Sequence, residues 1–356
     1  MRKTRLKVLC IVSIMPPYQG GAAVDYGIIL ERLGAGFNRD FDIRVLTERG
    51  CSKGSDGVVY DDSLLNYDSA PIKRRAHQAI NYLKIIREIL FSGSDIVHIH
   101  ARYVYGRYIG RVIWLALFLS PAKVVVDIRD RFYRNFGFGH NFIICSDELR
   151  DFYGWIENAV TIPVPLALKP LRPSVLPGRK MAYFGTIARN KGVLELLDAY
   201  GEYRKGSQTP LGLDFYGFNA MGAEFTERAA KIEGAAYLGG VSPGEVVDKI
   251  LEYKAVVLPS ASEGMPRVCL EAMYARRIIF CHESVRRSIP CIPEAFTFRD
   301  ASRDLPGLIL KAETADNDIS YVYDFKRHDP YAVCVELADL YRWIAPERRS
   351  KEARTT

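Results

Sequence analysis

The sequence predicts an α/β protein made of two doubly wound domains, each with a parallel β-sheet. Short β-branched runs alternate with helical patterns along the chain, as parallel sheets require. A chain of 356 residues exceeds the usual size of one hydrophobic core. The proline-dense stretch Thr161–Pro173 marks a linker. We therefore expect a first domain over 1–165 and a second over 166–330.

Each half of the chain supplies its own set of strands. The first-half strands are expected at Val8–Ile14, Ile43–Thr47, Ile96–His100, Val124–Asp127 and Phe142–Cys145. Helical spacing of apolar residues predicts helices between them, over Val24–Leu33, Ile80–Leu90 and Tyr105–Leu119. The second-half strands are expected at Met181–Phe184, Leu213–Tyr216, Ala236–Leu238, Ala255–Leu258 and Ile278–Cys281. A last amphipathic helix is expected over Tyr331–Ile344, after Asp329-Pro330.

Composition argues against several classes of protein. The seven cysteines are scattered, odd in number and without a Cys-x-x-Cys pair, which disfavours a disulfide framework and a zinc site. The basic start before Val8–Met15 mimics a secretion signal, but the apolar run is short and ends in Pro16-Pro17 without a small-residue cleavage site. No apolar run is long enough to span a bilayer. We expect a cytoplasmic protein.

Positive charge gathers in residues 71–134, where twelve Lys/Arg face four Asp/Glu. Tyr103, Tyr105, Tyr108, Trp114 and Phe118 are interleaved with these basic residues. The pattern suits an anionic membrane surface at the inner face of the membrane, a polyprenyl diphosphate acceptor, or an ordinary solvated helix face. Nucleic acid ranks lowest because no nucleic-acid-binding motif accompanies the charge.

The most informative segment is Pro259–Met273, in which Glu263 and Glu271 stand eight positions apart across a helix start. Tyr253–Pro259 is predicted to be a short buried strand, followed by a turn and a helix whose first residue is Pro266. In a continuous helix the two glutamates would be separated by about 12 Å and rotated by about 80°. That geometry cannot chelate one small cation, so no metal site is expected.

Carboxylates at this spacing can accept hydrogen bonds from sugar hydroxyls, and a helix start offers N–H groups to phosphate. A capping glutamate followed by a solvated one is the simpler alternative. The segment Ser260-x-x-Glu-Gly-x-Pro with Leu-Glu-Ala-Met273 closely resembles the Glu-x7-Glu signature of retaining glycosyltransferase family 4. That family has the GT-B fold, in which two Rossmann-like doubly wound domains face a cleft. The resemblance covers roughly 8–285 and the last helix, which it implies returns to the first domain.

Phe184–Gly192 resembles the family's Gly-Arg-x-x-x-x-Lys-Gly element, whose two cations hold the donor diphosphate. Lys191 matches the lysine directly. Thr186 stands at the usual arginine position, and Arg189, three residues later, is a candidate to supply the missing charge. A charge-assisted hydrogen bond contributes roughly 1.5–3 kcal/mol, so this departure weakens the resemblance without removing it.

Further donor contacts follow from the resemblance. Glu263 would contact the hexose, Glu271 the ribose, and the loop at Tyr237–Ser242 the base. The remaining candidate donor contacts are Gly264, Met265, Pro266, Val241, Gly185, Thr186, Gly20 and Gly21. The glycine pair follows the first strand, where it permits close backbone approach.

The acceptor side has three candidates, His100, Arg129 and Asp130. Asp95–His100 resembles the family's Asp-x-Val-His-x-His strand, with His98 the more suited to a core role. Arg129 stands where many relatives have histidine, and a cation there would suit a phosphorylated or lipid-diphosphate acceptor. Asp130 would orient Arg129, approach the acceptor hydroxyl, or form a structural salt bridge.

Two regions depart from the family pattern. The usual Gly-x-Pro-Val is Arg276–Ile279, and a glycine-rich loop becomes Cys281–Ser288. The resemblance implies a metal-independent, retaining transfer of hexose from a UDP- or GDP-sugar to a hydroxyl acceptor, in surface polysaccharide or lipid-linked oligosaccharide synthesis. A soluble metabolite or a protein is the second acceptor class. The alternative of another class is a degenerate GT-B protein that binds sugar nucleotide or a partner without turnover.

Overall fold

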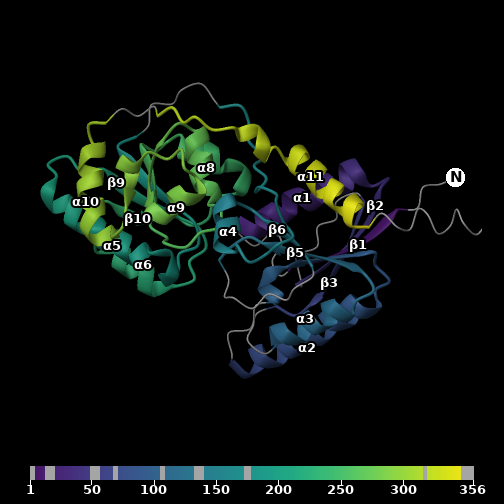
Figure 1. Ribbon diagram of the computed structural model, residues 1–356. Coiled ribbons are helices and arrows are strands. Elements are labelled where there is room, and N and C mark those ends of the chain that lie inside the picture. Colours follow the sequence, from purple (N-terminus) through teal and green to yellow (C-terminus); the bar gives the residue numbers. More distant parts are fainter. Residues whose placement is uncertain are drawn as a thin grey trace, which may run out of the picture. The chain divides into compact units, whose positions relative to one another are not determined.

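The fold is described from a computed structural model (Figure 1). It describes residues 5–12, 21–48, 57–66, 71–104, 109–131, 140–171, 178–315 and 319–345. The contacts divide the chain into two compact units. Unit 1 comprises Met1–Tyr18, Ala22–Pro165 and Arg327–Thr356, and unit 2 comprises Gln19–Gly21 and Leu166–Lys326.

Unit 1 contains a parallel sheet in the order β3-β2-β1-β4-β5-β6-β7. Its strands are β1 (Leu6–Ile11), β2 (Phe41–Glu48), β3 (Val58–Leu64), β4 (Ile96–His100), β5 (Lys123–Ile128), β6 (Asn141–Ile144) and β7 (Ala159–Thr161). Its helices are α1 (Gly21–Phe37), α2 (Pro71–Phe91), α3 (Ile109–Leu119), α4 (Asp147–Phe152) and α11 (Pro330–Ile344). The central strands are buried on both faces, which explains their near-continuous apolar sequences.

Unit 2 contains a second parallel sheet, in the order β10-β9-β8-β11-β12-β13. Its strands are β8 (Lys180–Phe184), β9 (Gly212–Tyr216), β10 (Ala235–Tyr237), β11 (Ala255–Leu258), β12 (Ile278–His282) and β13 (Thr297–Phe298). Its helices are α5 (Val193–Gly206), α6 (Ala223–Ala230), α7 (Val246–Ile250), α8 (Arg267–Tyr274), α9 (Glu283–Ser288) and α10 (Ala301–Ala312). The two predicted parallel sheets are thus confirmed.

The chain's last described helix, α11, belongs to the core of unit 1. Asp329 caps it by accepting hydrogen bonds from the N–H groups of Tyr331 and Ala332 at 2.9 and 3.0 Å. Its apolar face, which includes Leu337 and Tyr341, joins the buried cluster built on α1 and the sheet. The first and last parts of the sequence therefore share one hydrophobic core.

The sequence expectations missed three edge strands, β3, β7 and β13. An edge strand has one exposed side, so its sequence lacks the continuous apolar run that marked the central strands. One helix start was wrong: Pro266 is not the first helical residue but precedes α8, with ψ 106° in the extended region. Within the described residues, no helix combines the length and apolarity needed to cross a membrane.

Candidate functional site

The candidate donor residues follow neighbouring strands of the unit 2 sheet. All pairings in this sheet are parallel, so the loops after β10, β9, β8 and β11 leave from one edge. These loops carry Val241, Gly217, Gly185–Lys191 and Glu263, respectively. Ligands of open parallel sheets bind outside the carboxyl ends of the strands. The topology therefore brings the candidates from separate stretches of sequence to one edge.

Glycines let three of these loops approach each other closely. The N–H of Gly217 donates to the carbonyl of Gly239 at 2.8 Å, and the N–H of Gly185 donates to that of Tyr216 at 2.9 Å. Gly217 has φ 135°, and a Cβ added there would stand 1.9 Å from the Gly185 carbonyl oxygen. The backbones of Gly217 and Gly185 thus lie against each other at the strand ends. Any residue with a Cβ at position 217 would prevent this close approach.

Lys191 and Glu263 meet directly at this edge. The Lys191 Nζ donates to Glu263 Oε1 at 2.6 Å, with side chains 25% and 17% exposed. Gly192 lets the two loops approach closely. Its φ of 71° is left-handed, and an added Cβ would lie 2.9 Å from the carbonyl oxygen of Pro259. The predicted diphosphate cation and the predicted sugar-binding carboxylate are therefore one ion pair.

Thr186, which stands at the family's arginine position, accepts a hydrogen bond through its backbone carbonyl. The buried Tyr183 donates its hydroxyl hydrogen to the Thr186 carbonyl at 2.9 Å. Burial raises the pKa of Tyr183 above its ordinary value, and the negative charge of Glu263 adds to this. Tyr183 therefore stays a hydrogen-bond donor and fixes the course of the loop.

Glu271 lies on α8, largely buried, with Arg267 as its ion-pair partner. Arg267 Nη2 lies 3.5 Å from Glu271 Oε1, and the two side chains are 13% and 9% exposed. Sequence reasoning did not select Arg267. The available signal was a basic residue inside the signature itself, midway between its two glutamates.

Arg189, the other candidate cation, pairs with a residue outside the signature segment. Its side chain is 70% exposed and forms an ion pair with Glu224 on α6. Val241 is half-buried after β10, and Gly264 to Pro266 lie in the turn that leads into α8. Gly21 is the first residue of α1, while Gly20 lies outside the described residues.

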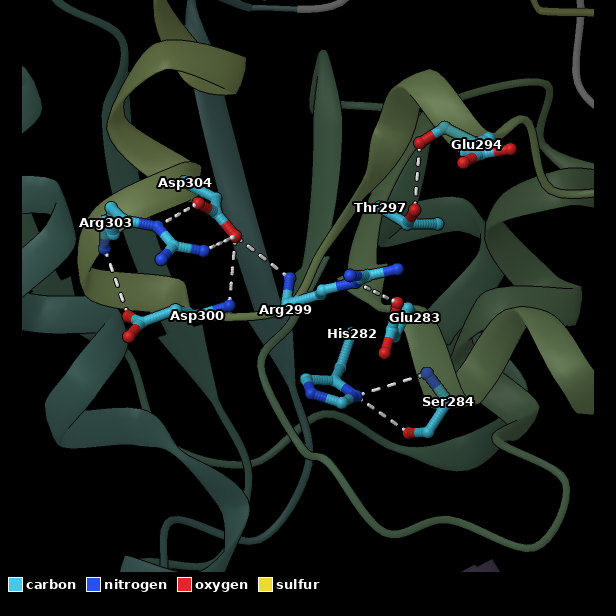
Figure 2. Close-up of polar contacts among 9 residues, drawn as sticks. All are labelled: His282, Glu283, Ser284, Glu294, Thr297, Arg299, Asp300, Arg303 and Asp304. Atoms are coloured by element: carbon cyan, nitrogen blue, oxygen red, sulfur yellow. Dashed lines mark hydrogen bonds and ion pairs between the residues drawn. The ribbon is translucent and has the colours of Figure 1, made fainter.

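The altered loop at Cys281–Ser288 forms the short helix α9 (Figure 2). His282 caps it, since its Nδ1 accepts the N–H of Ser284 at 3.1 Å, and the Ser284 hydroxyl donates to the carbonyl of Ala261 at 2.8 Å. Glu283 pairs with Arg299 at 2.6 Å. The loop that departs from the family is thus hydrogen-bonded to the turn that carries Glu263.

The other segment that departs from the family pattern, Arg276–Ile279, follows the end of helix α8. Arg276 has φ 58°, the left-handed conformation that glycine adopts at lowest cost. Arg276 therefore ends α8 in a backbone conformation that a glycine would adopt at lower cost.

The acceptor-side candidates lie in unit 1, where Arg129 belongs to a buried polar cluster centred on Asp127. Arg129 Nε is 2.8 Å from Asp127 Oδ1, and the Tyr26 hydroxyl donates to Asp127 Oδ2 at 2.7 Å. His98 Nε2 lies 3.4 Å from the same carboxylate, and His98 Nδ1 shares a 2.5 Å hydrogen bond with the Tyr341 hydroxyl. Burial opposes ionisation of Asp127, but the Arg129 charge and the His98 hydrogen bond outweigh it and hold the pKa well below its usual range.

This cluster bears on the expected roles of Arg129 and His98. The charge of Arg129 is balanced by Asp127, and a role for Asp130 in orienting Arg129 stays a prediction. His98 has the core role expected for it. Asp127 was missed, although a carboxylate directly between the valine run Val124–Val126 and Ile128 was a visible signal.

His100 is buried, with its ring edge-on to Tyr26. Burial lowers its pKa to about 4, with the Arg129 charge acting in the same direction and Asp127 opposing it. His100 is therefore neutral at neutral pH. Asp130 is half-buried and accepts the N–H of Arg131 at 2.7 Å.

Comparisons with known proteins bear on the family and the fold. The family model described as "Glycosyl transferases group 1" matches residues 174–286, the stretch that contains the Lys191–Glu263 pair. A search of curated protein sequences found no match.

Three solved structures illustrate the similarity of fold. Sucrose-phosphate synthase from Thermosynechococcus elongatus is 13% identical with a TM-score of 0.66, over 96% of this chain and 99% of that one. WaaG, a glycosyltransferase involved in lipopolysaccharide biosynthesis, is 15% identical with a TM-score of 0.61, over 97% and 98%. The pneumococcal O-GlcNAc transferase GtfA, solved with UDP and GlcNAc, is 12% identical with a TM-score of 0.62, over 98% and 100%. These neighbours have the GT-B fold, and so does this chain.

Proposed function

Because the family model described as "Glycosyl transferases group 1" matches residues 174–286, we propose that this chain transfers a hexose from a UDP- or GDP-sugar to a hydroxyl acceptor, with retention of anomeric configuration. The observation that carries this proposal is the 2.6 Å pair between Lys191 and Glu263 at the carboxyl edge of the unit 2 sheet. The two side chains come from loops seventy-two positions apart in the sequence. A cation for phosphate and a carboxylate for hydroxyls are thus in contact.

Donor binding would exchange the partners of this pair. A diphosphate at the sheet edge competes with Glu263 for the Lys191 ammonium group, because both are anions. Glu263 is then released to accept hydrogen bonds from hexose hydroxyls and to stabilise positive charge that develops at the anomeric carbon. Lys191 neutralises the leaving diphosphate, so the transfer needs no divalent metal.

The rest of the donor would lie along the same edge. Glu271 accepts hydrogen bonds from ribose hydroxyls, and backbone groups near Val241 contact the base. The turn from Gly264 to Pro266 lies beside the hexose, and the glycines after β8 admit the phosphates to the backbone. UDP in the similar GtfA structure supports a nucleotide-sugar donor.

The acceptor would be held by unit 1. His100 is neutral and can exchange a hydrogen bond with an acceptor hydroxyl, and Asp130, which directly follows Arg129, offers a half-buried carboxylate. Because Asp127 balances the charge of Arg129, the cluster favours the hydroxyl of the acceptor over a phosphate as the group bound there. A saccharide carried on a polyprenyl diphosphate fits this if its phosphates lie elsewhere.

We further propose that unit 1 docks on the inner face of the membrane, through a surface that we call the α2–α3 face. Helices α2 and α3 pack together (Figure 1). Their exposed apolar residues are Ile72, Ile80, Leu83, Phe91, Val112, Leu115, Phe118 and Leu119. The same helices carry Lys73, Arg74, Arg75, Lys84, Arg87 and Arg111. Apolar insertion combined with positive charge is the chemistry of an anionic lipid surface. Such docking suits surface polysaccharide or lipid-linked oligosaccharide synthesis.

Nucleotide release from a panel of UDP- and GDP-sugars tests the function. We expect slow donor hydrolysis that frees UDP or GDP from one donor class, at the same rate with and without EDTA. Binding of a donor without any release would favour the alternative of a GT-B protein that binds sugar nucleotide without turnover, which the absence of arginine at Thr186 supports. Loss of release in EDTA would contradict metal independence.

A further inference from the structure

We infer that Arg267 supplies the second cation for the donor diphosphate, in the role that the family gives to an arginine at the position of Thr186. The inference rests on the proposed function and names one more binding residue for it. It replaces Arg189, which sequence spacing favoured.

The position of Arg267 matches the order of groups in a nucleotide sugar. In the donor, the diphosphate lies between the ribose and the hexose. In the signature, Arg267 lies four residues after Glu263, the proposed hexose ligand, and four before Glu271, the proposed ribose ligand. It is the first residue of α8, about 6 Å along the helix axis from Glu271. A phosphate placed between the two carboxylates would therefore lie beside Arg267.

Arg189 is a weaker candidate on contact and exposure. Its side chain is 70% exposed and paired with Glu224, whereas Arg267 is 13% exposed. Charge–charge interactions strengthen as water is excluded, so the same guanidinium group contributes more at the Arg267 position. Arg267 and Lys191 are also matched, because each forms an ion pair with one glutamate of the signature.

The chemistry of arginine suits a shared role. The Arg267–Glu271 separation of 3.5 Å is longer than a well-formed charge-assisted hydrogen bond. A guanidinium group has five N–H donors in a planar fork and can contact a carboxylate and a phosphate oxygen together. Arg267 can therefore orient Glu271 toward the ribose while it binds the adjacent phosphate. Lysine at this position would keep the charge but lose the fork.

Equilibrium binding of UDP, GDP and their nucleosides to the full-length protein tests the inference. Arg267→Ala should weaken binding of whichever nucleotide the unmodified protein prefers by about 10- to 100-fold, the range for one charge-assisted contact. Binding of the matching nucleoside should weaken by a clearly smaller factor, because the nucleoside loses only the orientation of Glu271. Arg267→Lys should recover part of the loss. Arg189→Ala should change nucleotide binding less than about threefold.

Arg179→Ala is the matched control, because Arg179 precedes β8 at the opposite edge and bonds to Thr209. A loss with Arg189→Ala and none with Arg267→Ala would overturn the inference and leave the proposed function intact. Equal losses for nucleotide and nucleoside would also overturn it, because they would assign Arg267 only to the positioning of Glu271. If the unmodified protein binds neither UDP nor GDP, the proposed function and the inference fail together.

Discussion

At the scale of single residues, the site could be predicted where a motif ties a residue type to a role. Glu263, Glu271 and Lys191 stand at motif positions, and the structure places Lys191 and Glu263 in contact. Arg267 was missed because a basic residue in the first turn of a helix is normally a solvated one. In the folded protein Arg267 pairs with Glu271 on the next helical turn, and both side chains are largely buried. Arg267 is therefore not a solvated surface residue.

The two signature glutamates should fail in different ways when removed. Glu271→Ala should raise the KM for the donor about 10- to 100-fold, because it loses contacts made equally in the ground state and the transition state. Glu263→Ala should lower kcat about 100-fold or more, because its contact strengthens as charge develops. Steady-state kinetics on the active donor measures both. Glu252→Ala, beyond the amino end of β11, is the control. Unchanged kinetics in both variants would remove this assignment.

Gly217 makes a prediction about stability. Gly217→Ala should cost about 2 kcal/mol or more of the free energy of unfolding, because its Cβ would collide with the Gly185 carbonyl at 1.9 Å. Gly201→Ala is a control of opposite sign. Gly201 lies inside α5 with nothing within 4 Å of an added Cβ, so alanine there should stabilise by about 0.5–1 kcal/mol. Urea unfolding of both variants tests the pair, and an unchanged midpoint for Gly217→Ala would contradict the close approach.

At the scale of elements, the sequence was most informative for buried strands. Strand β4 has the bounds that its apolar run predicted, and β11 has those of the shorter expectation, Ala255–Leu258, rather than Tyr253–Pro259. The strand expected at Val8–Ile14 extends past residue 12, so its last two residues lie outside the described part of the chain. The edge strands β3, β7 and β13 and the short helix α9 could not be predicted, because tertiary contacts such as the Ser284 bond to Ala261 stabilise such elements more than any local pattern does.

The α2–α3 face makes a prediction about lipid binding. Binding to phosphatidylcholine vesicles should rise with added phosphatidylglycerol and fall with salt, because surface charges are screened. Leu83→Glu with Phe118→Glu should weaken binding to the anionic vesicles about tenfold or more. Val322→Glu is the control, since Val322 is apolar and even more exposed than Leu83 and Phe118 but lies in unit 2. Sedimentation with vesicles measures each case, and equal binding to neutral and anionic vesicles would contradict the proposal.

At the scale of the whole molecule, two parallel sheets could be predicted from the alternation of patterns alone. The buried polar cluster of unit 1 could not, because Asp127, Tyr26 and Tyr341 come from stretches that no local pattern connects. Such a cluster exists only once α1, β4, β5 and α11 have come together. The effects of this cluster, such as shifted pKa values, therefore exist only in the folded protein.

One such property is the pH dependence of stability. His100 has a pKa of about 4 in the folded protein against an ordinary value of 6.5, so the unfolded chain binds more protons between these limits. Its contribution is complete above pH 6.5 and is lost as the pH falls toward 4, by up to about 3 kcal/mol. Urea unfolding across this range measures the slope, and His100→Gln should flatten it. A slope that His100→Gln leaves unchanged would mean that other groups carry the dependence.

The placement of α11 has a consequence for how the protein is made. Unit 2 is essentially one continuous stretch, Leu166–Lys326, and can complete its core while the ribosome still holds the end of the chain. Unit 1 cannot, because residues such as Leu337 and Tyr341 belong to its core and follow unit 2 in the sequence. Unit 1 therefore keeps apolar surface uncovered until Pro330–Ile344 has been synthesised.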